Sequence, residues 1–392
     1  MDYNLKKAIK SNIEKLPLGS TVLLPCLKFI YLFFIYKPLH IRSKYLKKRT
    51  EIKEAKEILK ACQLSHVKEV IVIYDLLSSP PTYGDFLYVV MLARYFFLFK
   101  KKVNFWIINS EFRYDTREAY SVNEIQKFIN NILEIPQVLL NFGNTIDIKT
   151  YTWPETLSLL DKYKNNASSY ICFKQLVTER KAIYLHCFNV INYLFKLGPK
   201  IEHKKFLLFA EDLLSYLNIE IPRIPYITWH VRYSTKWGFN RNLTDDEFAR
   251  IYASLSTLFP DHKIMIVSDE IGCGFFKKLS LKKNLGLIFS KDFSHTFMGD
   301  AALILKSDYF FALRGGGISA IPIFSQMRYG IIATPVHEST QSKNKIALWS
   351  TKEQVFKNAA KGMPDDIFLS KSMKIKCQNV EIQMNTDYKT LK

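Results

Sequence analysis

Short apolar runs rich in β-branched residues alternate with helical stretches in two blocks of this chain, and this alternation restricts the fold more than any other feature. In the first block, residues 67–74 (VKEVIVIY) have the composition of a buried strand, residues 86–99 that of a helix, and residues 103–109 that of a second strand. A helix is expected before them, over residues 51–64. Strand, helix and strand in this order form the βαβ unit of a parallel sheet.

The second block begins after residues 220–225 (EIPRIP), whose two prolines favour a domain boundary. In chain order we expect strand 226–231, helix 245–258, strands 263–267 and 286–289, helix 298–305, strand 308–313, helix 318–326 and strand 330–333. The region between the blocks, residues 121–219, is expected to be mainly helical, with helices over 124–133, 154–163, 174–197 and 206–217.

These patterns predict an α/β protein with two doubly wound, Rossmann-like domains facing a cleft. Residues 51–220 form the first domain, which would receive an acceptor, and residues 221–345 form the second, which would bind a donor nucleotide. Residues 346–392 form a polar tail that is expected to return to the first domain. The length of 392 residues fits two domains.

The N-terminal region, residues 1–50, combines basic and apolar residues. An apolar stretch over residues 21–36 is interrupted by Lys28 and is short of the roughly 20 residues of a membrane span. Lysines and arginines flank it on both sides, which suits a helix lying among the headgroups of an anionic membrane. An apolar helix packed on the first domain is the alternative. The membrane reading places the protein in the cytoplasm, peripherally on the cytoplasmic face of a membrane.

The chain has 56 Lys and Arg against 36 Asp and Glu, a formal charge of +20, which favours an anionic partner. A Lys-, Asn- and Ile-rich composition from an AT-biased genome explains the excess equally well. Charge therefore does not choose between nucleic acid, an acidic membrane and phosphorylated small molecules.

Cations follow the first strand of the second block. His230 ends the strand, and Arg232, Lys236 and Arg241 follow it in the loop. Arginine offers a planar fork of donors to phosphate oxygens, and lysine adds a mobile positive charge. Ligands of open α/β sheets bind at the carboxyl ends of strands, so this segment is typical of a diphosphate site. A core histidine at a strand end is the alternative for His230.

Two further segments follow strands of the same block. Ser268 and Asp269 could contact a ribose or a base, and a helix N-cap is an equally good interpretation of either. Asp300 begins a helix, and the loop RGGGIS allows a phosphate or ribose to approach its backbone closely. The candidate binding residues of that loop are Arg314, Gly315, Gly316 and Ser319.

With these motifs in order, residues 221–335 resemble the fucosyltransferase-like GT-B glycosyltransferases, in particular the α1,6-fucosyltransferases and their nodulation-factor relatives. The first motif of that family is His-Val-Arg-Arg-Thr-Asp-Lys, and this chain matches it at His230, Val231, Arg232 and Lys236. The resemblance implies a GT-B fold, a GDP-sugar donor such as GDP-fucose, and Arg232 on its β-phosphate. It also implies that His230 and Lys236 assist and that Asp300 and Ser319 lie near the nucleotide.

The chain departs from the family at Tyr233, where a second arginine is expected, and at Thr235, where an aspartate is expected. Asn240 stands where some members have an acidic residue that is a candidate base. The resemblance therefore fixes neither the base nor the sugar.

An inverting transfer needs a proton acceptor, for which a carboxylate from the first domain is the usual solution. Asp85 is our candidate, with Asp75 as second choice, although a helix N-cap is the stronger interpretation of Asp85. The sequence contains no Asp-x-Asp pair, so we expect no metal and no other cofactor.

The sequence thus favours a metal-independent, inverting glycosyltransferase that builds a cell-surface polysaccharide or lipopolysaccharide. Its acceptor would be a glycan or lipid-linked glycan, and no nucleic acid is expected. The same fold with a CMP-, ADP- or UDP-linked sugar is one alternative. A non-enzymatic protein whose basic residues bind a membrane or nucleic acid is the other.

Overall fold

The structure is a computed structural model. It describes residues 37–76, 82–108, 122–140, 147–172, 183–199, 206–233, 242–312, 317–325, 327–333, 372–377 and 380–385. Its contacts divide the chain into two units, Met1–Glu54 and Ala55–Lys392. The two sheets and the candidate site belong to the second unit.

Helix α3 (Lys37–Gln63) is 27 residues long and includes the helix expected over residues 51–64. Just beyond its end, Lys101 donates from Nζ to the carbonyl oxygens of Leu64 (2.8 Å) and Val67 (2.6 Å). Within the described residues, no helix combines the length and the apolar character needed to cross a membrane. The apolar stretch 21–36 lies outside the described residues.

The first sheet has the strand order β3-β2-β1-β4, and all its pairings are parallel. Its strands are β1 (Glu69–Asp75), β2 (Lys102–Ile108), β3 (Asp147–Tyr151) and β4 (Ser169–Cys172). The helices after β1, β2, β3 and β4 are, in turn, α4 (Tyr83–Phe97), α5 (Val122–Leu140), α6 (Trp153–Lys164) and α7 (Ile183–Leu197). The expected βαβ unit is confirmed as β1-α4-β2.

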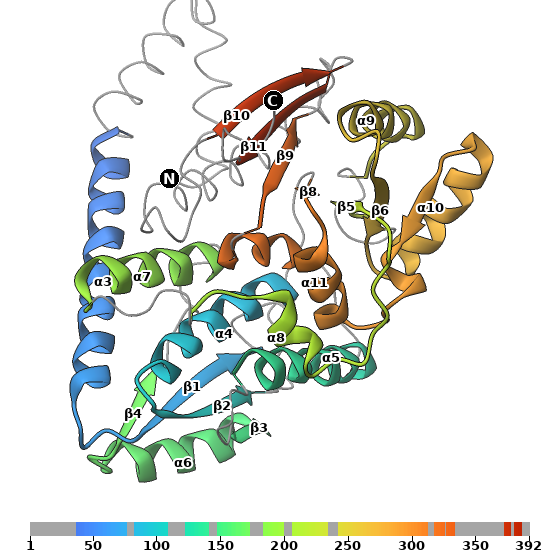
Figure 1. The fold of residues 1–392 in the computed structure, drawn as a ribbon. Helices are drawn as coiled ribbons and strands as arrows, with labels where there is room; N and C mark the ends of the chain where they lie inside the picture. Colours follow the sequence, from blue (N-terminus) through green and yellow to red (C-terminus); the bar gives the residue numbers. More distant parts are fainter. Residues whose placement is uncertain are drawn as a thin grey trace, which may run out of the picture. The chain divides into compact units, whose positions relative to one another are not determined.

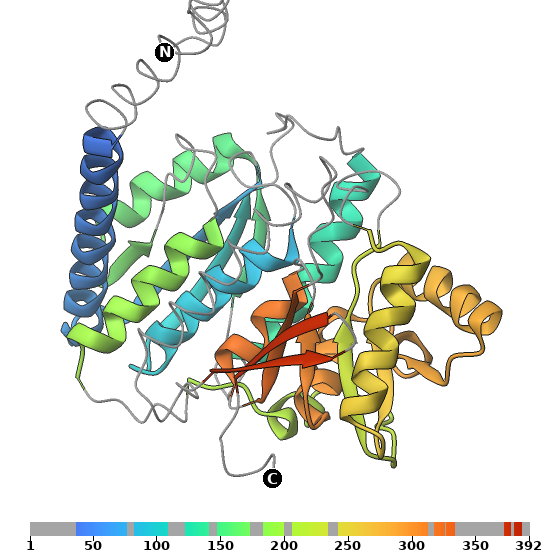
Figure 2. The same cartoon turned by 90° about the horizontal axis from the view of Figure 1, so that it is seen from above.

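Helices lie on both sides of this sheet (Figure 1), and alternation along its strands gives it two apolar faces. Val70 and Val72 of β1 pack in a cluster with residues of α4, α5 and α7. Ile71 and Ile73 face the other way and pack with Leu160 of α6. Helices cover both faces, which explains why β1 is a continuous apolar run. Figure 2 shows α4 and α7 side by side.

The second sheet has the order β10-β11-β9-β8-β5-β6-β7. Its parallel part consists of β5 (Tyr226–His230), β6 (Lys263–Val267), β7 (Leu287–Phe289), β8 (Phe310–Ala312) and β9 (Tyr329–Ala333). The helices are α8 (Ala210–Leu214) before β5, α9 (Asp245–Leu258), α10 (Glu270–Lys283) and α11 (Phe297–Lys306). The α/β class and the two doubly wound sheets are thereby confirmed.

The second sheet also has two faces. Ile264 and Ile266 of β6 pack with residues of α9 and α10. Met265 and Val267 pack on the opposite face, in the cluster that contains α4, α5, α7 and α11. One continuous core therefore joins the first lobe (β1–β4 and α4–α7) to the second lobe (β5–β9 and α9–α11).

Three sequence expectations were wrong. The region expected to be mainly helical contains β3 and β4, whose sequences DIKTY and SYIC are too short and too polar to stand out. Only residues 210–214 of the helix expected over 206–217 are helical, because Leu208 forms a parallel bridge with Ser325.

The helix expected over residues 318–326 is two 3₁₀ turns, η7 (Gly317–Ala320) and η8 (Pro322–Phe324), because Pro322 has no N–H for a continuous helix. Strands β10 (Ser372–Cys377) and β11 (Val380–Asn385) of the tail extend the second sheet by antiparallel pairing of β11 with β9. The other residues of the tail lie outside the described residues, and its return to the first domain stays a prediction.

Candidate functional site

The strand order of the second sheet reverses at β5. The chain adds β6 and β7 on one side of β5, then crosses over and adds β8 and β9 on the other. His230 lies abreast of Val267 on β6 and of Ala312 on β8. Such a switch point leaves an opening at the carboxyl ends of the two strands that diverge, and ligands of this fold class bind there. The segments that carry the predicted binding residues therefore start at one edge of the sheet.

His230 is held in place at this edge. It is 7% exposed, and its Nδ1 lies 2.9 Å from the carbonyl oxygen of Val267. A carbonyl oxygen only accepts, so Nδ1 carries the hydrogen of this bond. The histidine thus ties β5 to β6 immediately before the segment with Arg232.

Arg232 and Tyr233 follow β5 and are both partly buried. The Tyr233 ring stacks on Phe275 of α10, with centroids 4.1 Å apart and planes 14° apart. The position where the fucosyltransferase-like motif has its second arginine is therefore used for packing. Lys236, Arg241, Arg314, Gly315 and Gly316 lie outside the described residues, and only the backbone of Ser319, in η7, is described.

Ser268 and Asp269 lead from β6 into α10. Asp269 is the N-cap of this helix and accepts a hydrogen bond from the Gly272 amide at 2.7 Å. The helix-cap interpretation of Asp269 is confirmed. Ser268 is 5% exposed, and a Cβ at Gly272 would collide with its hydroxyl, so glycine leaves room for the serine beneath the first turn of α10.

Asp300 has a partner that the sequence did not indicate. Its Oδ2 lies 2.6 Å from Nζ of Lys291, and the two side chains are 9% and 10% exposed. Burial raises the pKa of Asp300 from 3.8 to about 6, against the attraction of Lys291. Asp300 is thus placed at the predicted edge, but its carboxylate is inside the protein and engaged with a cation.

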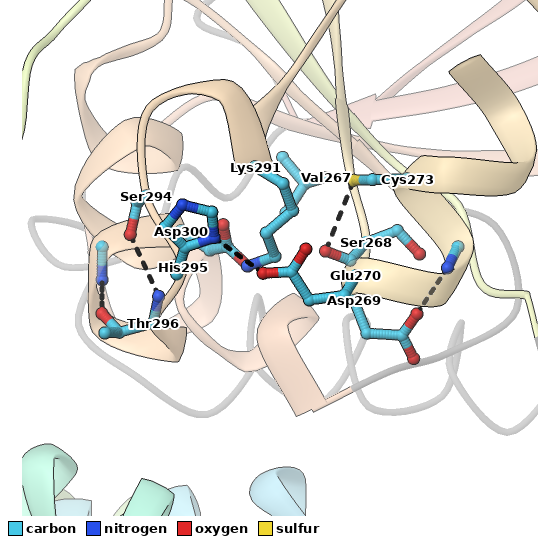
Figure 3. A network of polar contacts seen from close by, with 12 residues as sticks. Val267, Ser268, Asp269, Glu270, Cys273, Lys291, Ser294, His295, Thr296 and Asp300 are labelled. Carbon is cyan, nitrogen blue, oxygen red and sulfur yellow. Dashed lines mark hydrogen bonds and ion pairs between the residues drawn. The ribbon is translucent and has the colours of Figure 1, made fainter.

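A second polar pair bridges the starts of α10 and α11. His295 Nδ1 lies 2.7 Å from Glu270 Oε1, and both side chains are exposed. Figure 3 shows this pair beside Lys291 and Asp300, between the first turns of the two helices. Helix N-termini carry partial positive charge, so the two starts favour an anionic ligand in this area.

Glu134 of α5 also reaches this area, and sequence reasoning missed it. Its Oε2 accepts a 3.4 Å hydrogen bond from the amide of Met298 in α11. Burial raises the pKa of Glu134, while hydrogen bonds from Thr296 and Met298 and the charge of Lys291 oppose this rise. The sequence signal was weak, because Glu134 is one polar residue in an amphipathic helix.

Asp85, the candidate base, lies in the first turn of α4. The N-cap of this helix is Thr82, whose hydroxyl donates to Asp85 Oδ2 at 2.7 Å and accepts from the Asp85 amide at 3.3 Å. The expectation that Asp85 itself caps the helix was therefore wrong by three residues. The carboxylate is only partly buried.

The first turn of α4 touches the start of η7. A Cβ built on Gly84 would lie 3.0 Å from Gly317 Cα, and one on Gly317 would collide with the Gly84 amide nitrogen. Only glycines allow this approach. It brings the first-lobe turn that carries Asp85 against the last glycine of RGGGIS. Two regions singled out from the sequence as catalytic and binding thus meet in the structure.

The comparisons with known proteins are sparse. No protein-family model matches the sequence, and no curated protein matches it. Among solved structures, the chain is similar to the glycosyl transferase family 9 from Veillonella parvula DSM 2008, with 10% identity and a TM-score of 0.34 over 65% of this chain and 78% of that chain. It is also similar to POFUT1 in complex with GDP, with 11% identity and a TM-score of 0.29 over 65% of this chain and 93% of that chain. Scores this low add nothing to the strand order, on which the fold class rests.

Proposed function

We propose that this protein is an inverting glycosyltransferase of the GT-B type, which transfers a sugar from a GDP-sugar, GDP-fucose by preference, to a glycan. One observation carries the proposal. His230 lies abreast of Val267 and Ala312 at the switch point of the second sheet, with Arg232 two residues beyond it.

In the proposed reaction a hydroxyl of the acceptor attacks the anomeric carbon of the donor sugar. The bond between that carbon and the diphosphate oxygen breaks, and the nucleoside diphosphate leaves with the electron pair. Arg232 stabilises the charge that develops on the leaving phosphate, since a guanidinium binds phosphate oxygens through two donors at once. Lys236 and Arg241 add positive charge, so that no metal is needed.

The proton of the attacking hydroxyl needs an acceptor. Asp85 fits this role because its carboxylate lies in the first lobe, at a turn that touches Gly317 of the second lobe. The Thr82 hydroxyl donates to Asp85 Oδ2 and so holds the carboxylate in place.

We further propose that the acceptor is a lipid-linked glycan in cell-surface polysaccharide or lipopolysaccharide synthesis. The protein would act at the cytoplasmic face of a membrane, held there by the basic and apolar residues of its N-terminal region. Lysines and arginines on both sides of residues 21–36 support an anionic membrane surface as the partner.

The test is release of nucleotide from a panel of donors, namely GDP-fucose, GDP-mannose, UDP-glucose, ADP-heptose and CMP-sialic acid, with and without EDTA. We expect slow hydrolysis of a GDP-sugar alone, unchanged by EDTA and abolished in Arg232→Ala. Turnover of another donor would support the same enzyme class but show that the donor carries a nucleobase other than guanine. No turnover and no nucleotide binding by folded protein would reject the glycosyltransferase in favour of a non-enzymatic binding protein.

A further inference from the structure

Three charged side chains from both lobes gather around the first turn of α11. Lys291, in the 3₁₀ turn Ser290–Asp292 after β7, pairs with Asp300 of α11 at 2.6 Å. Glu134 comes from α5 of the first lobe, and the charge of Lys291 lowers its pKa against the effect of burial. A half-buried lysine therefore has one carboxylate from each lobe in its neighbourhood.

The first turn of α11 needs acceptors for its amides, as every helix start does. Thr296, the N-cap, accepts from the Gly299 amide at 3.0 Å. The Met298 amide donates to Glu134 instead, across the boundary between the lobes. A negative charge at a helix N-terminus also interacts favourably with the helix dipole.

Apolar contacts hold the same junction. The ring of Tyr83, the first residue of α4, stacks on Phe297, the first residue of α11, with centroids 4.9 Å apart and planes 7° apart. Tyr83 also accepts a 3.2 Å hydrogen bond from Asn131, one turn before Glu134 on α5. Glu134 is thus part of a packed interface, which limits its freedom to turn away from α11.

We propose that Glu134 is a positioning residue, which anchors the start of α11 to the first lobe and thereby keeps Lys291 and Asp300 at the edge where the donor binds. The link between this anchoring and donor binding rests on the proposed function, whereas the anchoring of α11 by Glu134 does not. Asp300 and Lys291 would then act on the site through the placement of α11, since their charged groups bond each other inside the protein.

Other titratable groups surround this network and would respond to the same substitutions. Glu270 of α10 adds to the rise that burial causes in the pKa of Asp300. Burial also raises the pKa of Tyr83, and the charges of Asp269 and Glu134 add to that rise. Burial raises the pKa of Cys273 to about 11, and Asp300 adds to this rise. None of these groups bonds the Met298 amide among the contacts that the structure describes, so exchange of that amide reports on Glu134.

The test measures hydrogen exchange of residues 297–300 in the full-length protein, together with nucleotide affinity. Glu134→Ala removes both the charge and the acceptor, and Glu134→Gln retains an acceptor oxygen. Gln137→Ala, an exposed position on the same helix, is the control. We expect Glu134→Ala to accelerate exchange at residues 297–300 about tenfold or more and to weaken nucleotide binding severalfold, Glu134→Gln to do so less, and the control to match wild type.

Exchange in both Glu134 variants at the wild-type rate would overturn the anchoring. Faster exchange with unchanged nucleotide affinity would overturn the link to the donor site. If wild type itself binds no nucleotide, the proposed function fails, while the exchange rates still decide whether Glu134 anchors α11. Glu134→Gln keeps the test decisive if Glu134→Ala does not fold.

Discussion

At the scale of the residue, burial determines the chemistry of the acids near the candidate site. Asp300 is 6% exposed, and its carboxylate is compensated by one lysine. Its Oδ1 and the neighbouring Ser290 hydroxyl are buried without a hydrogen bond of ordinary geometry among the described residues. An acid in this position holds a proton more readily than one in water, which makes its contribution to stability depend on pH.

Asp300→Asn tests this dependence. The pKa of Asp300 is 3.8 in its ordinary state and about 6 in the folded protein, so the folded state binds the proton more tightly between these values. The contribution of Asp300 is therefore fully present below about pH 4 and is lost as the pH rises through 6. We expect the difference in unfolding free energy between wild type and Asp300→Asn to fall over this range in urea titrations. Asp292→Asn, in the same 3₁₀ turn as Lys291, serves as the control. A difference in unfolding free energy between wild type and Asp300→Asn that does not change with pH would contradict the raised pKa of Asp300.

Gly299 is the second residue whose surroundings allow a direct test. A Cβ at this position would collide with the hydroxyl of the buried Ser294. We expect Gly299→Ala to lower the free energy of unfolding by about 1–3 kcal/mol, as overpacking does. Removing the obstacle in Gly299→Ala/Ser294→Ala should restore part of this loss relative to Ser294→Ala alone. Thermal unfolding of the four proteins gives the coupling, and additive effects would show that the collision is relieved elsewhere.

At the scale of the element, aromatic stacking joins β5 to the helices that cover it. Trp229 of β5 stacks on Phe248 of α9, and Phe248 stacks on Phe276 of α10, each with centroids 4.8 Å apart. Tyr233, beyond the end of β5, continues this packing through Phe275. The rings hold the start of the loop after β5 against α10, which orients the segment that carries Arg232.

Tyr233 is therefore expected to contribute to stability rather than to phosphate binding. Tyr233→Ala should cost about 1–3 kcal/mol of unfolding free energy through lost burial and stacking. Tyr233→Phe should behave as wild type, and Tyr233→Arg, which restores the arginine of the family motif, should also be less stable. Urea denaturation measures all three, and a Tyr233→Ala variant as stable as wild type would refute the packing role.

The sequence predicted the elements with long apolar runs and strong caps. Strands β1 and β5 are near-continuous apolar runs, and the capping box of Thr244 and Glu247 marks the start of α9 at residue 245. Strands β3 and β4 were missed because their positions are defined by pairing with β2 and β1, which local composition does not encode. The apolar run of β5 also made it predictable that the binding segments start at one edge of the second sheet, because this run fixes where the strand ends. The Lys291 partner of Asp300 and the reach of Glu134 were not, since both depend on tertiary contacts.

At the scale of the whole molecule, the buried side chain of Arg94 joins three segments that are far apart in the sequence. It extends from α4 and donates to the carbonyl oxygens of Phe206 and Leu207, each at 3.0 Å, and to that of Leu139 near the end of α5. Burial lowers its pKa to about 10, so the guanidinium remains charged at neutral pH. The next residue, Leu208, donates from its backbone amide to the carbonyl oxygen of Phe324 in the second lobe.

Arg94→Lys should be strongly destabilising, because one ammonium group does not reproduce the planar fork that serves three carbonyl groups. We expect Arg94→Met to lose about 3 kcal/mol or more of unfolding free energy, since buried carbonyl oxygens would be left without donors. Differential scanning calorimetry provides the measurement, with Arg223→Lys at an exposed position as the matched control. A loss below about 1 kcal/mol in Arg94→Met would contradict a joining role.

The central claim is that the edge of the second sheet around Arg232 binds a nucleoside diphosphate. Isothermal titration calorimetry with GDP, UDP, ADP and CMP, in EDTA, tests it on wild type, Arg232→Ala and the control Arg223→Ala. We expect GDP to bind wild type and the control equally, and Arg232→Ala to weaken binding about tenfold or more at unchanged thermal stability. Equal binding of GDP by Arg232→Ala and wild type, or no binding of any of the four nucleotides by folded wild-type protein, would contradict it.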